Sequence, residues 1–220
     1  MSVIIVAGHA ILRDIAHVKT DNGWYLLDFQ RGEPRRYIAH IERAIEEAAR
    51  QPDALLIFSG GPTRRDAGPR TEALSYWLVA EHFGWFGHSE VRDRAHLEDF
   101  ARDSFENLLF GICRAHEIKG HLPTSVTVVG WAFKRQRFED LHRAAIGWPA
   151  ERFHYIGAND PEHIDQAIAA ETSARARYTA DPYSLGPEFQ AKKTDRNPFR
   201  RQHGYAISCP EMFGLDKPWR

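Results

Sequence analysis

The chain has 220 residues, of which 43% are hydrophobic and 27% are charged, a composition that excludes disordered and collagen-like proteins. Its 29 lysines and arginines nearly balance its 30 acidic residues, so the formal net charge is -1 and no global positive field favours nucleic acid or an anionic membrane. The N-terminal apolar run at 3–7 is too short for a signal peptide or a membrane span, and the two cysteines fit a reducing compartment, each as a buried, small apolar residue. We therefore expect a cytoplasmic protein that binds neither nucleic acid nor membranes.

The chain alternates between short apolar runs and longer helical patterns. Strands are expected at 3–7, 55–58, 91–98, 126–129 and 153–156. Helices are expected at 37–49, 71–83, 104–116, 135–146 and 161–178. Helices between fully apolar strands require right-handed crossovers, which make the sheet parallel. The pattern predicts an α/β fold, a Rossmann-like three-layer sandwich with a mainly parallel sheet of about five strands, over residues 1–180.

Two stretches lack this regular pattern. Residues 8–34 form a long connection after the first strand, which is expected either to cover a site or to carry a small hairpin. Residues 181–220 hold five of the twelve prolines, so regular structure should be scarce there. The tail is either a flexible extension or a segment packed on the domain, and its many large apolar side chains favour packing.

The tail contains two features with specific expectations. The short apolar run 205–207 is a candidate edge strand or a plug for a groove. The basic pairs 192–193 and 200–201 are expected to face solvent, although one of these cations reaching a ligand is an open alternative.

Glycines and polar residues follow the predicted strands, at the sheet edge where open parallel sheets bind ligands. Gly8 and His9 follow the first strand. Ser59, Gly60 and Gly61 follow the second, with Arg64 shortly after them. The backbone N–H groups of this glycine loop are candidates to cradle an anion, and the alternative is an ordinary tight turn. The loop matches neither a Walker A motif nor a complete G-x-G-x-x-G fingerprint.

Acidic residues open two of the predicted helices. Glu72 lies in a first helical turn, where it either stabilises the helix dipole or serves a site. Asp103 and Glu106 have the spacing of a capping box. Asp103, Glu106 and Asn107 also share one helical face, which is either solvated or part of a site.

Cations cluster after the fourth predicted strand. Lys134 and Arg137 lie near the start of a helix, where the helix dipole disfavours positive charge. Either an anionic ligand or a partner acid explains their placement, and an arginine fork suits phosphate or carboxylate. The twelve histidines show no metal-binding spacing, so no metal site is predicted from local motifs.

These motifs, in this order, resemble the widespread domain of unknown function typified by the bacterial proteins YdcF, SanA and ElyC. The resemblance covers residues 3–157 and rests on the glycine loop at 59–61, the Thr-Glu-Ala of 71–73, Glu98 with the Ser-x-Glu-Asn of 104–107, and Arg137. The longer stretch 98–104 and the proline-rich tail are more similar to the soluble fungal branch than to the membrane-anchored bacterial one. The resemblance implies a Rossmann-like fold, and it suggests S-adenosylmethionine as a ligand because one bacterial member is described as binding it. It implies no general reaction.

The chain departs from the family pattern at three places. Ser104 replaces the usual threonine but retains the hydroxyl, and Gly130 and Trp131 stand where bacterial members have a Thr-Ser pair. Lys134 stands where those members have a histidine, so a role that needs an imidazole there does not carry over. Arg137 matches the family pattern, so the resemblance still implies an electrostatic role for its positive charge.

Two classes of function remain. The first is an enzyme that acts on a small anionic substrate, nucleotide-like or phosphorylated, with His9, Glu72 and Glu106 as candidate acid-base groups. The second is a non-catalytic binder of S-adenosylmethionine or a nucleotide. The expected ligand-binding residues are Gly8, Ser59, Gly60, Gly61, Arg64, Asp103, Ser104, Asn107, Lys134 and Arg137.

Overall fold

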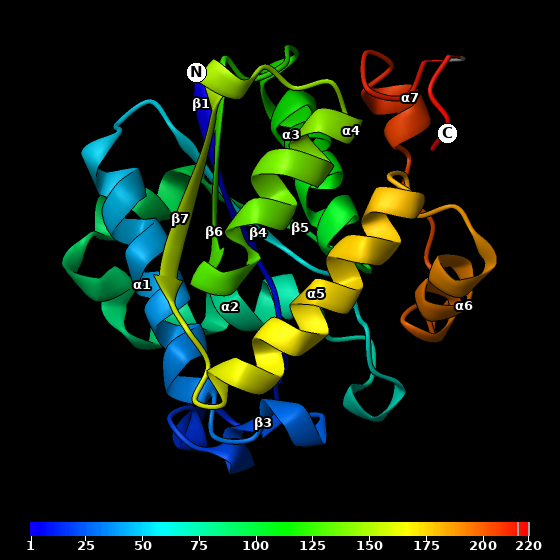
Figure 1. The fold of residues 1–220 in the computed structure, drawn as a ribbon. Coiled ribbons are helices and arrows are strands. Elements are labelled where there is room, and N and C mark those ends of the chain that lie inside the picture. Colours follow the sequence, from blue (N-terminus) through cyan, green and yellow to red (C-terminus); the bar gives the residue numbers. More distant parts are fainter. Residues whose placement is uncertain (215, 220) are drawn as a thin grey trace.

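The computed structural model describes residues 1–214 and 216–219, and its centre is a five-stranded parallel sheet (Figure 1). The sheet has the order β5-β4-β1-β6-β7, and all neighbouring strands run parallel. Its strands are β1 (Ser2–Ala7), β4 (Leu55–Ser59), β5 (Ala95–Glu98), β6 (Ser125–Trp131) and β7 (Phe153–Asn159). The predicted fold class is confirmed, with β5 beginning later than expected because Ser89–Arg94 forms a 3₁₀ turn.

Helices cover both faces of this sheet. Their bounds are α1 (Pro34–Arg50), α2 (Glu72–His82), α3 (Ser104–Lys119), α4 (Arg143–Ala145), α5 (Ile164–Ala180), α6 (Pro187–Asp195) and α7 (Tyr205–Ser208). The predicted helix over 135–146 is instead a π-helical segment, Arg137–His142, continued by the short α4. None of the described helices combines the length and the apolar character that crossing a membrane requires.

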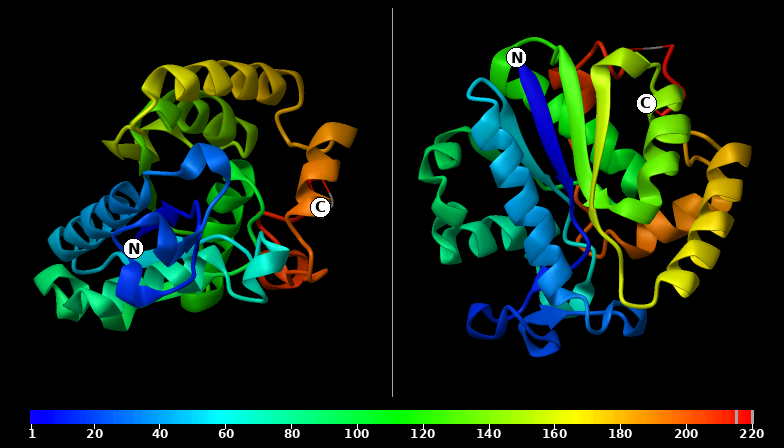
Figure 2. Two further views of the ribbon diagram at one scale, coloured as in Figure 1. Left: turned by 90° about the horizontal axis from the view of Figure 1, so that it is seen from below. Right: turned by 60° about the vertical axis from the view of Figure 1, so that its left-hand side comes forward.

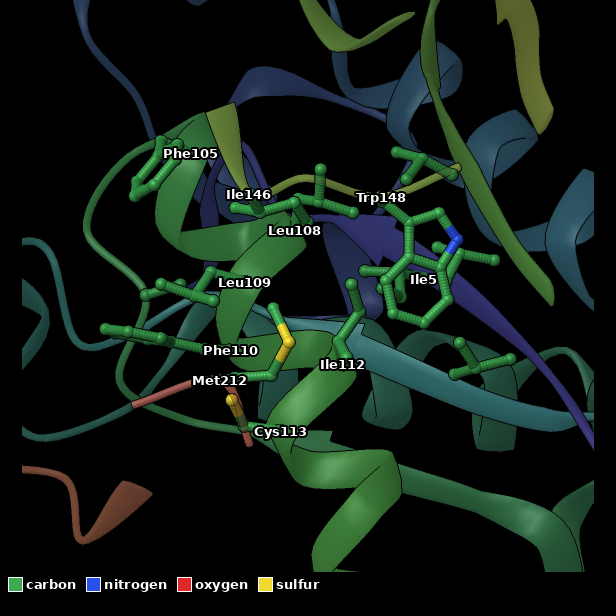
Figure 3. Packing of buried hydrophobic residues seen from close by; sticks show 14 of the residues in the cluster. Ile5, Phe105, Leu108, Leu109, Phe110, Ile112, Cys113, Ile146, Trp148 and Met212 are labelled. Carbon is green, nitrogen blue, oxygen red and sulfur yellow. The ribbon is translucent and has the colours of Figure 1, made fainter. Parts of the chain in front are cut away.

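The two faces of β1 belong to two separate cores, as the alternation of strand side chains requires. Ile4 and Val6 pack with α1 and α2. Val3 and Ile5 pack with α3, and Figure 3 shows Ile5 among the side chains of that helix. All four side chains are fully buried, so β1 is fixed by apolar packing on both faces.

The strand order places a topological switch point at the centre of the sheet. From β1 the chain first builds β4 and β5 on one side and then crosses to β6 and β7 on the other. The connections leaving β1 and β6 therefore diverge at the carboxyl edge. In open α/β sheets this divergence creates the crevice that binds ligands.

The segment 8–34 both forms a hairpin and reaches this edge. Its strands β2 (Ile11–Leu12) and β3 (Trp24–Tyr25) pair antiparallel. Trp24 is buried, and its indole N–H donates to the carbonyl of Val18 at 2.8 Å. Seen from the carboxyl ends of the strands, the segment lies over the sheet edge, with α5 above it and α6 at the right of the view (Figure 2, left).

The described part of the tail, 181–214 and 216–219, contributes to the core beneath α3. Phe189, Tyr205, Cys209, Met212 and Phe213 belong to the same buried cluster as the α3 side chains. Figure 3 shows Met212 lying against that helix. Positions 215 and 220 of the predicted tail lie outside the described residues. Both cysteines of the chain are free and buried.

Regular structure in the described tail is scarce, as expected, and is limited to α6 and α7. Pro187 occupies the first turn of α6, where its missing N–H costs nothing. The edge-strand alternative for 205–207 and the expectation that Lys193 faces solvent were wrong. The run Tyr205–Ser208 is helical and not an edge strand, and the Ile207 side chain is 88% exposed. Lys193 does not face solvent but is buried at 4% exposure.

Candidate anion-binding site

A cavity of about 190 Å³ lies at the switch point, between the connections that leave β1 and β6. Gly8 borders it from the first connection, and Gly130 and Lys134 border it from the second. Two larger cavities of about 620 and 530 Å³ adjoin it. His9, Phe29, Gln30 and Lys192 border all three, so the three cavities form one cleft.

The structure brings most of the predicted site residues to the central cavity. These are Gly8, His9, Glu72, Asp103, Ser104, Asn107, Lys134 and Arg137. Four elements supply them, namely the connections after β1 and β6 and the first turns of α2 and α3. Parallel strands end at one edge, which explains how residues so far apart in sequence meet.

The glycine loop after β4 lies behind the cavity and not in it. The N–H of Gly60 donates to the carbonyl of Glu98 at 2.9 Å, and that of Gly61 to the carbonyl of Ala101 at 2.7 Å. Because both donors are used by the connection after β5, neither is free for a ligand. The predicted anion cradle at Gly60 and Gly61 is therefore wrong.

The same loop has a structural use for its first glycine. Gly60 has a φ of +151°, and a Cβ at this position would come within 2.6 Å of the Glu72 carboxylate. The glycine thus lets the backbone approach a buried acid at the cavity wall.

Ser59 and Arg64 also lie outside the central cavity. Ser59 is fully buried, and its Oγ lies 2.7 Å from Glu98 Oε2 and 2.8 Å from Asn107 Oδ1. Burial raises the pKa of Glu98 to about 7 against the effect of these hydrogen bonds. Arg64 borders only the adjoining 620 Å³ cavity, where it forms two hydrogen bonds with Asp66 at 2.8 and 2.9 Å.

Glu106 is engaged by cations beside the cavity, which it does not border. Its carboxylate accepts hydrogen bonds from the Arg102 guanidinium at 2.6 and 2.9 Å and lies 3.2 Å from Lys193 Nζ. Burial opposes its ionisation, but these partners lower its pKa. Asp103 caps α3 by accepting the Glu106 N–H at 2.9 Å. The cap at Asp103 is therefore confirmed, but the reciprocal half of a capping box is not formed, because the Glu106 carboxylate accepts the N–H of Arg102 at 2.9 Å instead of that of Asp103. Glu106 is not positioned as an acid-base group.

Glu72, in contrast, is a buried acid on the cavity wall. Its carboxylate accepts a hydrogen bond from the Thr63 hydroxyl at 2.5 Å and lies 3.5 Å from Arg196 Nη2. Burial raises its pKa above the ordinary range, while Arg196 and Thr63 act in the opposite direction. A buried carboxyl group with a raised pKa on a cavity wall is a candidate for proton transfer.

His9 is held by aromatic neighbours and faces the cleft. Its ring stacks on Trp131 with centroids 5.6 Å apart and meets His40 edge-on at 5.3 Å. Burial, followed by the charge of Lys134, lowers the pKa of His9 well below its ordinary value, so the imidazole is neutral. Its Nε2 atom is buried without a hydrogen-bond partner among the described residues.

Four cations border the central cavity in addition to the paired Arg102. They are Lys134, Arg137, Lys192 and Arg196. Arg137 is 8% exposed and pairs with Glu171 of α5 at 3.0 Å, while its Nε atom is buried without a partner in the described chain. Burial, followed by the positive charge of Arg137, lowers the pKa of Lys134 to about 7.

The tail supplies two of these cations. Sequence reasoning missed Arg196, whereas Lys192 belongs to the basic pair 192–193, for which reaching a ligand was the open alternative. Lys192 and Arg196 lie four residues apart at the end of α6, a spacing that puts both on one helical face. That spacing is the signal that was available. The prolines around it had suggested a tail without helices, so the face was not recognised.

Comparison with known proteins gives one relative and no assigned function. The chain is 28% identical to "Uncharacterized protein YOR238W" of Saccharomyces cerevisiae over an alignment that covers 96% of this chain and 89% of that protein. No family model matches the sequence. No solved structure matches it either.

Proposed function

We propose that this protein binds a small phosphorylated, nucleotide-like anion at the switch point of its sheet and acts on it there. The observation that carries the proposal is the gathering of Lys134, Arg137, Lys192 and Arg196 around one small cavity. Within the described residues neither Lys134 nor Lys192 has an ion-pair partner. Arg137 and Arg196 have the partner acids Glu171 and Glu72, whereas gathering the two unpaired lysines beside them costs electrostatic free energy, which an anion offsets.

The adjoining cavity of about 530 Å³ supports a nucleotide-like ligand over inorganic phosphate. Phe29, Trp131 and Phe133 border it, and Phe29 is 79% exposed. Exposed aromatic faces are suited to stacking on a planar ring. A ligand with its phosphate near Arg137 and its base near Phe29 occupies both cavities.

Catalysis is the second part of the proposal, and His9 and Glu72 support it. A neutral imidazole with a free Nε2 can accept a proton, and a carboxyl group with a raised pKa can donate one. In this assignment His9 is the base, Glu72 the acid, and the cations around Arg137 stabilise developing negative charge. We also propose that the protein belongs to the YdcF-like family and is cytoplasmic.

A non-catalytic S-adenosylmethionine binder is the alternative from the family resemblance. That ligand carries a sulfonium cation, which the positive cavity repels. The charge of the site therefore favours a phosphate ester.

A ligand screen by thermal unfolding tests the proposal. Nucleotides or sugar phosphates are expected to raise the melting temperature, S-adenosylmethionine to leave it unchanged, and stabilising compounds to be converted on incubation. Glu72→Gln should retain the stabilisation and lose the conversion. If a compound stabilises the wild-type protein but is not converted, the protein is a non-catalytic binder. If no phosphorylated compound stabilises it, the proposal fails.

Anion affinity is expected to fall as the pH rises through 7. The Lys134 ammonium, with a pKa of about 7, loses its proton in this range. Affinity should drop by up to about tenfold per pH unit above that value. Isothermal titration calorimetry between about pH 6 and 9 measures this fall in affinity. The control is Lys134→Arg, whose side chain stays charged over this range. An equal pH dependence in Lys134→Arg contradicts the assignment to Lys134.

In the ligand-free protein, Lys134 should make the free energy of unfolding rise with pH, whereas anion affinity falls. The pKa of Lys134 is depressed from 10.5 to about 7, so the unfolded chain binds more protons than the folded one between these values. The contribution of Lys134 to the unfolding free energy therefore rises with pH across that window and is lowest below it.

A further inference from the structure

A second cluster of chemically reactive side chains lies away from the anion site, where the tail meets α3. His116 comes from the last turn of α3, and Cys209 and Glu211 directly follow α7. One donor atom from each residue lies within 4.8 Å of the other two. His116 Nε2 and Glu211 Oε1 are 3.2 Å apart.

The hydrogen bonds of His116 leave one nitrogen available to a ligand. Its Nδ1 lies 2.9 Å from the carbonyl oxygen of Ser208, which can only accept a hydrogen bond. Nδ1 therefore carries the proton, and in the neutral ring Nε2 holds a free electron pair toward Cys209 and Glu211. Histidines that bind metals are typically oriented by this same contact, an N–H donated to a backbone carbonyl.

We propose that His116, Cys209 and Glu211 bind a zinc ion. A thiolate, an imidazole and a carboxylate together match the donor preferences of zinc, whereas magnesium and calcium take oxygen donors alone. Zinc bonds of about 2.0 to 2.3 Å in tetrahedral geometry separate their donor atoms by about 3.3 to 3.7 Å. The 3.2 Å between His116 Nε2 and Glu211 Oε1 is close to that range.

An ion pair between a protonated His116 and Glu211 accounts for only two of the three residues. It leaves out Cys209, whose fully buried sulfur contacts the Cys113 thiol in the core and also lies within 4.8 Å of both polar groups. The Glu211 side chain is 50% exposed, so an ion can enter from solvent, and a water molecule can complete the coordination.

The proposed ion would join α3 to the tail. Met212 and Phe213, directly after Glu211, are buried in the core that α3 lines. Figure 3 shows Met212 close to Cys113 of α3. Zinc bound at His116 would thus stabilise the packing of the tail on α3. The zinc ion would take no direct part in the proposed anion chemistry.

Metal binding to the full-length protein tests the site directly. The metal-stripped protein is titrated with zinc against a chromogenic chelator, and with cobalt while thiolate-to-cobalt absorption is recorded in the near ultraviolet. We expect one zinc per chain, a higher melting temperature with zinc, and a cobalt-thiolate band. Cys209→Ser should lose that band, and Cys113→Ser, the other buried thiol, should keep it.

If the buried variant Cys209→Ser does not fold, Glu211→Gln provides a second test, because the Glu211 side chain is half exposed. This exposed substitution removes a ligand, so it is expected to weaken zinc by at least the roughly 10- to 100-fold that loss of a residue supporting a ligand causes. Asp216→Asn, which removes an equal charge from the same tail, should leave the affinity unchanged. Absence of the cobalt band in wild type, its loss in Cys113→Ser alone, or equal weakening by both acid substitutions overturns the proposal.

Discussion

Replacing Arg137 with alanine is expected to weaken binding of the phosphorylated ligand about 10- to 150-fold, which corresponds to about 1.5 to 3 kcal/mol for a charged hydrogen bond. Arg137 is buried at the cavity wall, and its Nε has no partner within the described chain. The dissociation constant is measured by isothermal titration with whichever nucleotide or sugar phosphate most stabilises the wild type. An unchanged constant removes Arg137 from the site.

The control for this variant must separate ligand binding from the loss of an ion pair. Arg137→Ala also leaves Glu171, 6% exposed, without its partner at 3.0 Å, which costs folding stability. Glu171→Gln breaks the same pair but retains the guanidinium. It should lower the melting temperature while leaving ligand affinity equal or higher. Equal loss of affinity in both variants would show that the effect is structural.

Truncation after Ala180 is expected to give an insoluble or unfolded protein. The truncation removes Phe189, Tyr205, Met212 and Phe213 from the core beneath α3. Burial of four such side chains contributes roughly 6 to 12 kcal/mol, at about 1.5 to 3 kcal/mol each. Entire domains are stable by only about 5 to 15 kcal/mol. The test compares the melting temperature and solubility of a chain of residues 1–180 with those of the full chain.

Limited proteolysis of the intact protein gives an independent reading of the same segment. Lys193 Nζ donates to Ser184 Oγ at 2.7 Å and lies 3.2 Å from Glu106 Oε1. Trypsin is therefore expected to cut slowly at this buried lysine. Rapid cleavage there, or equal melting temperatures for the two chain lengths, would show that the tail is dispensable.

The central strands were predictable because burial on both faces leaves continuous apolar runs in the sequence, whereas their order in the sheet was not predicted. The run 3–7 contains apolar residues and no polar alternation, and only a central strand of a parallel sheet is buried in this way. The same reasoning places residues after β1 and β6 at one edge. That is why Lys134 and Arg137 could be assigned to the site before the structure.

The errors arose where a residue's partner is distant in sequence. The N–H groups of Gly60 and Gly61 are used by carbonyls after β5, and nothing local to the loop reveals that strand as its neighbour. Lys193 was expected in water because a lysine pair usually faces solvent. Its carboxylate partners Asp103 and Glu106 lie at the start of α3, about two fifths of the chain away.

The proposed anion site and the tail are thermodynamically coupled, because Lys192 of α6 and Arg196 directly after it border the central cavity. A ligand that contacts these cations must raise the free energy needed to detach α6. By reciprocity, a change that makes the tail harder to detach tightens ligand binding to the extent that the tail detaches in the ligand-free protein. Hydrogen exchange of the α6 amides therefore reports occupancy of the cavity without any label on the ligand.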